Sequence, residues 1–327
     1  MRRLLALIGA LVMVGGALAI RSTIDDDKGG GSSGDGTLRL LCASELANVC
    51  DELDRIDGVD VDTASVGSVT DDSDQLLDYD GWLTFERSAQ RVRQARERAQ
   101  LDPVIERASA PIARSPVIIA IAQERAEVLA EHCGDDITWQ CIGDVGGTPW
   151  QAIGGSITWG DVKPAHADPE DTGEGLVIIG QQAGHFFGRE KLSTFDFEDD
   201  GFLDWLGKVK PPELVSNGFD GLLTTRSATY DVVATLEART DQALAQRERV
   251  ELIYPAPVAT ADVVYAPVVD GNSELFDIVT GDDGQDALSS AGFRLDDEGE
   301  PRLPRGSNLP PAGALEALLQ TWREVTG

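Results

Sequence analysis

Short apolar runs that alternate with amphipathic stretches are the feature that most constrains how this chain folds. Residues 37–42 (TLRLLC), 59–66 (VDVDTASV) and 116–122 (PVIIAIA) have the apolar runs or the alternation of strands. Residues 45–56 and 87–99 lie between these runs and have the pattern of helices. Strands that alternate with helices predict an α/β fold, with a mainly parallel sheet flanked by helices on both faces.

The second half of the sequence continues this alternation. Residues 295–313 are acidic and rich in proline, so we expect them to be exposed. The last predicted helix places Leu315, Leu318, Leu319 and Trp322 on one face. The other predicted helices are over residues 125–132, 173–187, 201–209, within 272–291 and over 314–325. Residues 75–83 are predicted to form a loop, a short helix and a strand, residues 230–238 a strand or a strand–helix junction, and residues 250–254 and 261–269 strands.

The amino terminus predicts export from the cytoplasm. Two arginines precede residues 4–20, an apolar run without a charge. Ala17-Leu18-Ala19 fits a signal-peptidase site, whereas 17 helical residues would span about 25 Å of a hydrocarbon layer of about 30 Å. We favour a cleaved signal peptide, with a membrane anchor as the alternative. Residues 21–36, which include KGGGSSGDG, are predicted to be a flexible linker.

The charge balance excludes two classes of partner. The chain has 57 acidic and 27 basic residues, which gives a formal net charge of −30. Nucleic acids and anionic lipid surfaces attract basic proteins, so neither is an expected partner. The acidic residues are spread through loops, as expected for a strongly solvated surface.

Four cysteines form two pairs of identical spacing, Cys42 with Cys50 and Cys133 with Cys141. In an exported protein this spacing favours two local disulfides, one of the three pairings that four cysteines allow. A zinc site is the alternative. Neither pair has the short gap of a zinc motif, and only His132 lies near a pair, so no metal site is predicted.

Residues 159–176, WGDVKPAHADPEDTGEGL, end a polar loop at a predicted helix start. Asp171 and Thr172 are residue types that cap helices, and an apolar run follows from Leu176. The first N–H groups of such a helix have no partner within the helix, so they can bind an oxyanion. An ordinary capped surface helix has the same sequence pattern.

Several segments, in their order and spacing, resemble a known family. They are LRLLCASEL (38–46), DYDGWL (78–83), IARSPVIIAI (112–121), the segment 159–176, ELIYPAP (251–257), ADVVYAPVV (261–269) and LFDIVTGDDGQDALSSAGFR (275–294). Together they resemble the bacterial extracellular solute-binding proteins of the periplasmic type II class, in particular the molybdate- and sulfate-like branch. The resemblance covers about residues 38–294.

The resemblance implies two α/β lobes that close on a ligand in the cleft between them. Lobe I would comprise residues 37–114 and 251–327, and lobe II residues 115–250. The implied function is capture of a small polar ligand, with oxyanions among the candidates, for a membrane permease of the ABC transporter type. The resemblance implies no enzymatic activity and no cofactor.

The resemblance also implies a set of ligand-binding residues. Ser44 corresponds to a binding serine after the first strand, and it is also of a helix-capping type. Gly67-Ser68 corresponds to the turn after the second strand, and the longer serine–glycine loop of oxyanion binders is missing there. The full predicted set is Ser44, Ser68, Trp82, Arg114, Ser115, Thr172, Gly173 and Arg226.

Most of these residues also have a structural interpretation. Tryptophan is more often a core residue than a ligand platform, which applies to Trp82. Arg114 and Arg226 are cations that could bind a carboxylate or an oxyanion, but most arginines are simply solvated. Glu237 could contact a ligand, although a salt-bridged surface glutamate is the more common case.

Two other functions fit the sequence less well. A cell-surface interaction or adhesion module could retain the same fold, because fold alone does not determine function. A serine hydrolase would need a base among His132, His166 and His185, and Ser68 lies in only half of a nucleophile motif. Transport binding predicts tight ligand capture, adhesion does not, and hydrolysis predicts turnover.

Overall fold

The computed structural model describes residues 37–134, 137–210, 230–240, 250–295, 299 and 301–326. Residues Leu38–Gly327 form one compact unit. The predicted leader and linker, residues 1–36, lie outside the described residues. Within the described part of the chain, no helix is long and apolar enough to span a bilayer.

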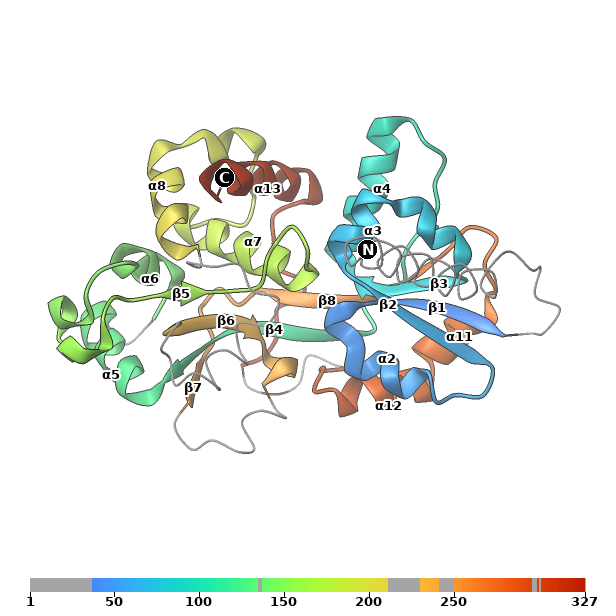
Figure 1. Ribbon diagram of the computed structural model, residues 1–327, viewed down its shortest axis with the longest axis horizontal. Coiled ribbons are helices and arrows are strands. Elements are labelled where there is room, and N and C mark those ends of the chain that lie inside the picture. The colour runs from blue at the N-terminus through green and yellow to red at the C-terminus, as the bar shows by residue number, and fades with distance from the viewer. Residues whose placement is uncertain are drawn as a thin grey trace, which may run out of the picture. The chain divides into compact units, whose positions relative to one another are not determined.

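The first section of the sheet has a parallel core. Strand β1 (Leu38–Ala43) lies between β2 (Val59–Ala64) and β3 (Gly81–Phe85) and is parallel to both. Figure 1 shows α3 and α4 on one face of these strands, and α2, α11 and α12 on the other. Because the three strands are parallel, their carboxyl ends lie at one edge of the sheet, and the segments that follow them emerge there together.

Two long strands connect this section to the rest of the sheet. Strand β8 (Thr260–Pro267) pairs with β3, and the first residues of β4 (Ala113–Ala122) pair with β8. The later residues of β4 pair with β6 (Val232–Leu236) and β7 (Val250–Ile253), and β5 (Pro164–Ala165) pairs with β6. The strand order is therefore β2-β1-β3-β8-β4-β6-β5, with β7 beside β4.

The α/β fold predicted from the sequence is confirmed, but the pairing within the sheet is mixed. Three pairs are parallel: β1 with β2, β1 with β3, and β5 with β6. The pairs that involve β8, and the pairs of β4 with β6 and β7, are antiparallel. An apolar run indicates that a strand is buried, but it does not indicate whether the strand is parallel or antiparallel to its neighbours. The antiparallel pairs could therefore not be predicted from the sequence.

The helices follow the predicted order, and α7 has the predicted bounds. The segment 272–291 forms two helices, separated at Gly281, where an added Cβ would lie 2.5 Å from the carbonyl oxygen of Asp277. The α-helices are α2 (Ala47–Leu53), α3 (Val66–Asp71), α4 (Glu86–Ala99), α5 (Gln123–Cys133), α6 (Trp139–Val145), α7 (Gly173–Phe187), α8 (Asp200–Val209), α11 (Glu274–Thr280), α12 (Asp282–Ser290) and α13 (Ala312–Thr326). The 3-10 helices are η1 (Ser44–Leu46), η2 (Ser73–Asp78), η3 (Trp150–Ile153), η4 (Ile157–Trp159), η5 (Thr194–Glu198) and η6 (Glu237–Arg239).

The carboxy-terminal helix α13 packs as its sequence pattern predicts. Leu315, Leu318, Leu319 and Trp322 are all buried, and the helix contacts α4, α7 and α8. The predicted exposure of residues 295–313 is only partly correct, because Leu303 and Leu309 in this segment are buried. Prolines prevent regular structure there, but they do not prevent the leucines from packing against the core.

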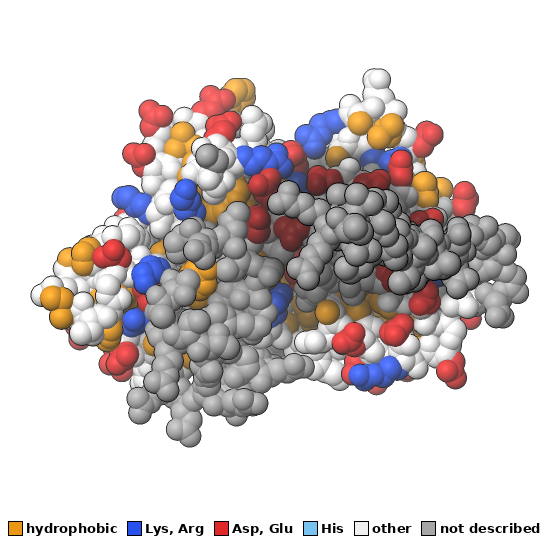
Figure 2. Space-filling model, viewed as in Figure 1, with side chains coloured by type: hydrophobic (Ala, Val, Ile, Leu, Met, Phe, Trp, Pro, Cys, Tyr) orange, Lys and Arg blue, Asp and Glu red, His pale blue; other side chains and the backbone are white. Residues whose placement is uncertain are grey.

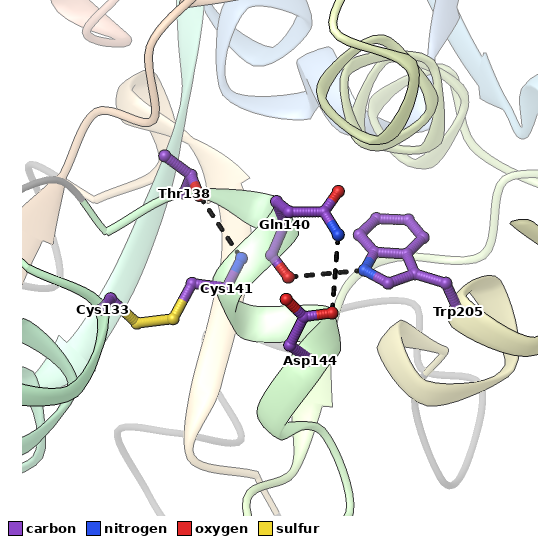
Figure 3. Close-up of a disulfide and its surroundings, with 6 residues drawn as sticks. All are labelled: Cys133, Thr138, Gln140, Cys141, Asp144 and Trp205. Atoms are coloured by element: carbon purple, nitrogen blue, oxygen red, sulfur yellow. Dashed lines mark hydrogen bonds between the residues drawn. A yellow bond between two sulfur atoms is a disulfide. The ribbon is translucent and has the colours of Figure 1, made fainter. Parts of the chain in front are cut away.

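Both predicted disulfides are present. One joins Cys42 at the end of β1 to Cys50 in α2, and the other joins Cys133 at the end of α5 to Cys141 in α6. Figure 3 shows the second disulfide beside the start of α6, where the Thr138 hydroxyl accepts a hydrogen bond from the Cys141 N–H. The first bridge therefore fixes α2 close to β1, and the second fixes α6 close to α5.

The Cys133–Cys141 bridge should stabilise the fold by limiting the freedom of the unfolded chain. It closes a loop of about nine residues, for which the chain-entropy model gives about 2.5 kcal/mol. We expect the variant C133A/C141A to have a free energy of unfolding lower by about that amount in urea denaturation under non-reducing conditions. An unchanged free energy of unfolding would show that the bridge is not formed in solution.

Candidate functional site

The start of α7 is the capped helix start that the sequence predicts. The hydroxyl of Thr172 accepts a hydrogen bond from the Gly175 N–H at 3.0 Å and donates one to the carbonyl oxygen of Asp168 at 2.6 Å. The Thr172 N–H also donates to the carbonyl of Asp168. Thr172 therefore is the N-cap of α7, and its side chain satisfies one of the N–H groups that the helix leaves without a partner.

The other free N–H groups of α7 are satisfied by a carboxylate from a distant part of the chain. Oε1 of Glu45 accepts hydrogen bonds from the N–H groups of Gly173 and Glu174, the latter at 3.3 Å. Glu45 lies in η1, directly after β1. A negative charge at this position is also stabilised by the positive end of the helix dipole.

The segments after β2 and β3 reach the same place. The Gly67 N–H, after β2, donates to the carbonyl of Asp171 at 3.0 Å. A Cβ on Gly173 would lie 2.6 Å from the Phe85 ring and 2.8 Å from the Ser88 hydroxyl, at the end of β3 and the start of α4. We call this meeting point, formed by Glu45, Gly67, Ser88 and residues 171–174, the junction.

The junction is acidic. Glu174 is buried and is held by the Thr235 hydroxyl at 2.7 Å and the Arg239 guanidinium at 3.1 Å. Burial raises the pKa of Glu45, and the nearby Glu174 charge adds to this effect, while the N–H groups of α7 oppose it. Figure 2 shows Asp and Glu side chains in the hollow between α13 and α4, with Lys and Arg side chains at its rim.

Two of the predicted site residues, Ser44 and Ser68, lie near the junction. Their secondary structure differs from the helix cap and the turn that the sequence predicts. Ser44 is exposed, and its hydroxyl lies 3.3 Å from Oε2 of Glu45. It does not cap a helix, because η1 begins at Ser44 itself. Ser68 is also exposed and lies within α3, not in a turn. The N-cap of α3 is Ser65, whose hydroxyl accepts from the Ser68 N–H at 3.1 Å.

Three other predicted site residues pack against or bond to other residues of the fold. Trp82 is fully buried in the core. Ser115 is also fully buried, and its hydroxyl accepts from the Ala238 N–H at 3.0 Å. Arg114 forms an ion pair with Asp262 at 3.2 Å and donates to the carbonyl of Pro304 at 2.8 Å. The eighth predicted residue, Arg226, lies outside the described residues.

Sequence analysis missed the residue that closes the junction. Glu45 follows Ser44 in the sequence, and only the serine is of a helix-capping type, so no sequence pattern singled out the glutamate. Glu237 is ion-paired, as its structural interpretation predicts. Its carboxylate binds Arg294 at 2.6 Å and accepts from the Tyr254 hydroxyl at 2.6 Å.

The histidines lie in different surroundings. His166 is fully buried, its ring is 5.1 Å from that of Trp322, and its Nδ1 donates to the carbonyl of Ala167. His185 donates to the carbonyl of Pro257, and His132 is exposed. Among the described residues, no group of His, Cys, Asp and Glu side chains is placed to hold a metal ion.

A separate cavity lies at the other end of α7. Its volume is about 540 Å³, and its lining includes Gln181, His185, Arg189, Lys191 and Pro257. It is an alternative place for a ligand, with a more basic lining than the junction.

Comparisons with known proteins identify the fold. No family model and no curated protein matches this sequence. Solved structures do match. A periplasmic binding protein from Actinobacillus pleuropneumoniae, solved with fructose-6-phosphate bound, is 13% identical with a TM-score of 0.59, over 89% of this chain and 97% of that one. This chain has the fold of a periplasmic substrate-binding protein.

Two further solved structures share this fold. The substrate-binding protein of an ABC transporter from Agrobacterium tumefaciens is 11% identical with a TM-score of 0.59, over 91% of this chain and 96% of that one. The apo ferric ion-binding protein A of Pasteurella haemolytica is 9% identical with a TM-score of 0.59, over 89% and 98%. One of these proteins was solved with fructose-6-phosphate and another is a ferric ion-binding protein, so this fold does not determine which ligand a protein binds.

The close contact at Gly173 should make any side chain there destabilising. We expect G173A to lower the free energy of unfolding by about 1–3 kcal/mol, because the new methyl group would overlap Phe85 and Ser88. Gly313 in α13 is a matched control, since nothing lies within 4 Å of its Cβ position. G313A should be neutral or slightly stabilising in the same urea titration. Equal effects of the two substitutions would contradict the close approach at the junction.

The buried His166 should make the protein less stable in acid. Burial lowers the pKa of His166 to about 4, so the folded state keeps this ring neutral while the unfolded chain protonates it near pH 6.5. Stability is therefore complete above about pH 6.5, and up to roughly 3 kcal/mol is lost as the pH falls towards 4. H166F should show a smaller loss over this range in urea titrations at several pH values. The same loss in H166F would contradict the assignment.

Proposed function

We propose that this chain is an exported solute-binding protein that captures a small polar ligand at the junction and delivers it to an ABC permease. The junction itself is the observation that carries the proposal. The segments after β1, β2 and β3 all contact the start of α7, a helix that belongs to the other section of the sheet. A site between two sections, built from backbone donors and short polar side chains, is typical of ligand capture.

The sheet supports a division into two lobes, which we propose as residues 37–114 with 251–327 and residues 115–250. Within β4, the residues up to Pro116 pair with β8, and those from Val117 onward pair with β6. Arg114 and Ser115 lie at this change of partner. Their bonds to Asp262 and Ala238 would hold the crossing strand while the sections move.

Ser44 and Ser68 are our proposed direct ligand contacts, because both are exposed next to residues that form the junction. Thr172 and Gly173 are also part of the proposed site, where they form the buried start of α7 that holds Glu45. Trp82, Arg114 and Ser115 would support the site from within the fold.

Two features support a location outside the cytoplasm. The basic and apolar amino terminus has the pattern of an export signal. Both pairs of cysteines form disulfides, which persist in oxidising compartments.

A thermal-shift screen of the purified chain against sugars, amino acids, amines and oxyanions tests the proposal. A ligand that binds only the folded state raises its melting temperature. We expect at least one solute to do so, and T172A to lose the shift, because this substitution removes the cap of α7. H185A is the matched control, since His185 lines the separate cavity and should keep the shift.

The other outcomes have definite meanings. If H185A loses the shift and T172A keeps it, the ligand binds in the separate cavity and the proposed site is wrong. If no solute shifts the melting temperature of the wild-type chain, solute capture is contradicted, and an adhesion role becomes the better account.

A further inference from the structure

We propose that Glu45 determines the charge class of the ligand. Its carboxylate occupies the oxyanion position at the start of α7, so the junction excludes free oxyanions and accepts neutral or cationic polar ligands. This inference rests on the proposed function, because it specifies the ligand of the same site. The sequence predicted a small polar ligand with oxyanions among the candidates, and this inference removes oxyanions from those candidates.

The position that Glu45 occupies has the donors of an oxyanion site. The N–H groups of Gly173 and Glu174 point at Oε1 of Glu45. The Ser88 hydroxyl is fully buried next to Gly173 and has no hydrogen-bond partner in the described part of the chain. One oxygen of a sulfate or phosphate could accept both backbone N–H bonds in place of Oε1, and a second oxygen could turn towards the Ser88 hydroxyl beside Gly173.

With Glu45 in place, the N–H groups of residues 172–175 are all occupied and none is left for an anion. The N–H groups of Thr172 and Gly175 are bonded to the Asp168 carbonyl and the Thr172 hydroxyl. Those of Gly173 and Glu174 are bonded to Glu45. An oxyanion would have to displace the Glu45 carboxylate and then replace both of its hydrogen bonds.

The charges around Glu45 also oppose an incoming anion. Among the described residues, no lysine or arginine forms an ion pair with Glu45, and the charge that acts on it is that of Glu174. Arg239 is paired with Glu174, and Arg323 with Glu170. A second negative charge would therefore meet a Glu45 carboxylate that no ion pair neutralises.

A ligand with a hydroxyl or an ammonium group fits this arrangement better. Glu45 is only partly buried, and among the described residues the one hydrogen bond to its Oε2 is a long one, from the Ser44 hydroxyl at 3.3 Å. A donor on the ligand could bind this oxygen while Oε1 stays on α7. The same carboxylate then binds both α7 and the ligand, and the ligand does not have to displace Oε1 from the helix.

Removal of the carboxylate tests the inference with inorganic sulfate as the probe. In E45A the donors at the start of α7 are vacated, so millimolar sulfate should raise its melting temperature by several degrees in a saturable way. The wild-type chain and E52A should respond to sulfate no more than to sodium chloride of equal ionic strength. Glu52 is the control, because it is an exposed carboxylate paired with Arg55.

A second substitution checks where the sulfate binds. S88A added to E45A should weaken the sulfate response several-fold, because it removes the buried hydroxyl beside Gly173. No sulfate response in folded E45A, or an equal response in E45A and E45A/S88A, would overturn the proposed oxyanion position.

A third test uses the wild-type chain alone, so its result does not depend on whether a variant folds. Hydrogen–deuterium exchange of a peptide covering residues 168–176 should be the same with and without sulfate. Slower exchange in sulfate would mean that an anion reaches α7 while Glu45 is present, which overturns the inference.

These experiments separate the inference from the proposed function. If no solute binds the wild-type chain but E45A gains a sulfate site, solute capture fails and the role of Glu45 stands. If the wild-type chain is stabilised by sulfate, phosphate or molybdate at the junction, capture stands and the role of Glu45 fails.

Discussion

The N–H groups at the start of α7 impose the constraint on which the junction depends. A helix cannot satisfy these groups itself, and here they lie among packed segments where unpaired donors are costly. The Thr172 hydroxyl, at the start of α7 itself, accepts a hydrogen bond from one of these groups. The Glu45 carboxylate, which follows β1, accepts hydrogen bonds from two. The need for acceptors at one helix thereby links parts of the chain that are 128 residues apart.

The sheet places these parts so that they can meet. Because β1, β2 and β3 are parallel, the segments after them leave the same edge, and all three contact the start of α7. Strands β4 and β8 join this section to the one that carries α7. In our proposal the two sections move about these two strands and close on a ligand between them. The same proposal assigns the charge class of that ligand to Glu45.

Local patterns predicted the parts of this structure that depend on neighbouring residues. The bounds of α7 follow from a capping threonine and an apolar run, and the buried face of α13 follows from its leucine spacing. The contact of Glu45 with Gly173 could not be predicted, because it depends on how distant strands are placed, and a glutamate after a strand has no distinctive pattern. For the same reason the sequence placed Ser44 and Ser68 near the site but gave them wrong local structures.

The bond between Glu45 and α7 can be observed directly by nuclear magnetic resonance of the folded chain. The amide proton shifts of Gly173 and Glu174 should titrate with a midpoint above the usual pKa of a glutamate, because burial and the Glu174 charge raise the pKa of Glu45. In E45Q this titration should disappear from both amides. If the two amides do not titrate in the wild-type chain, or titrate equally in E45Q, the carboxylate does not occupy the start of α7 and the account of the junction is wrong.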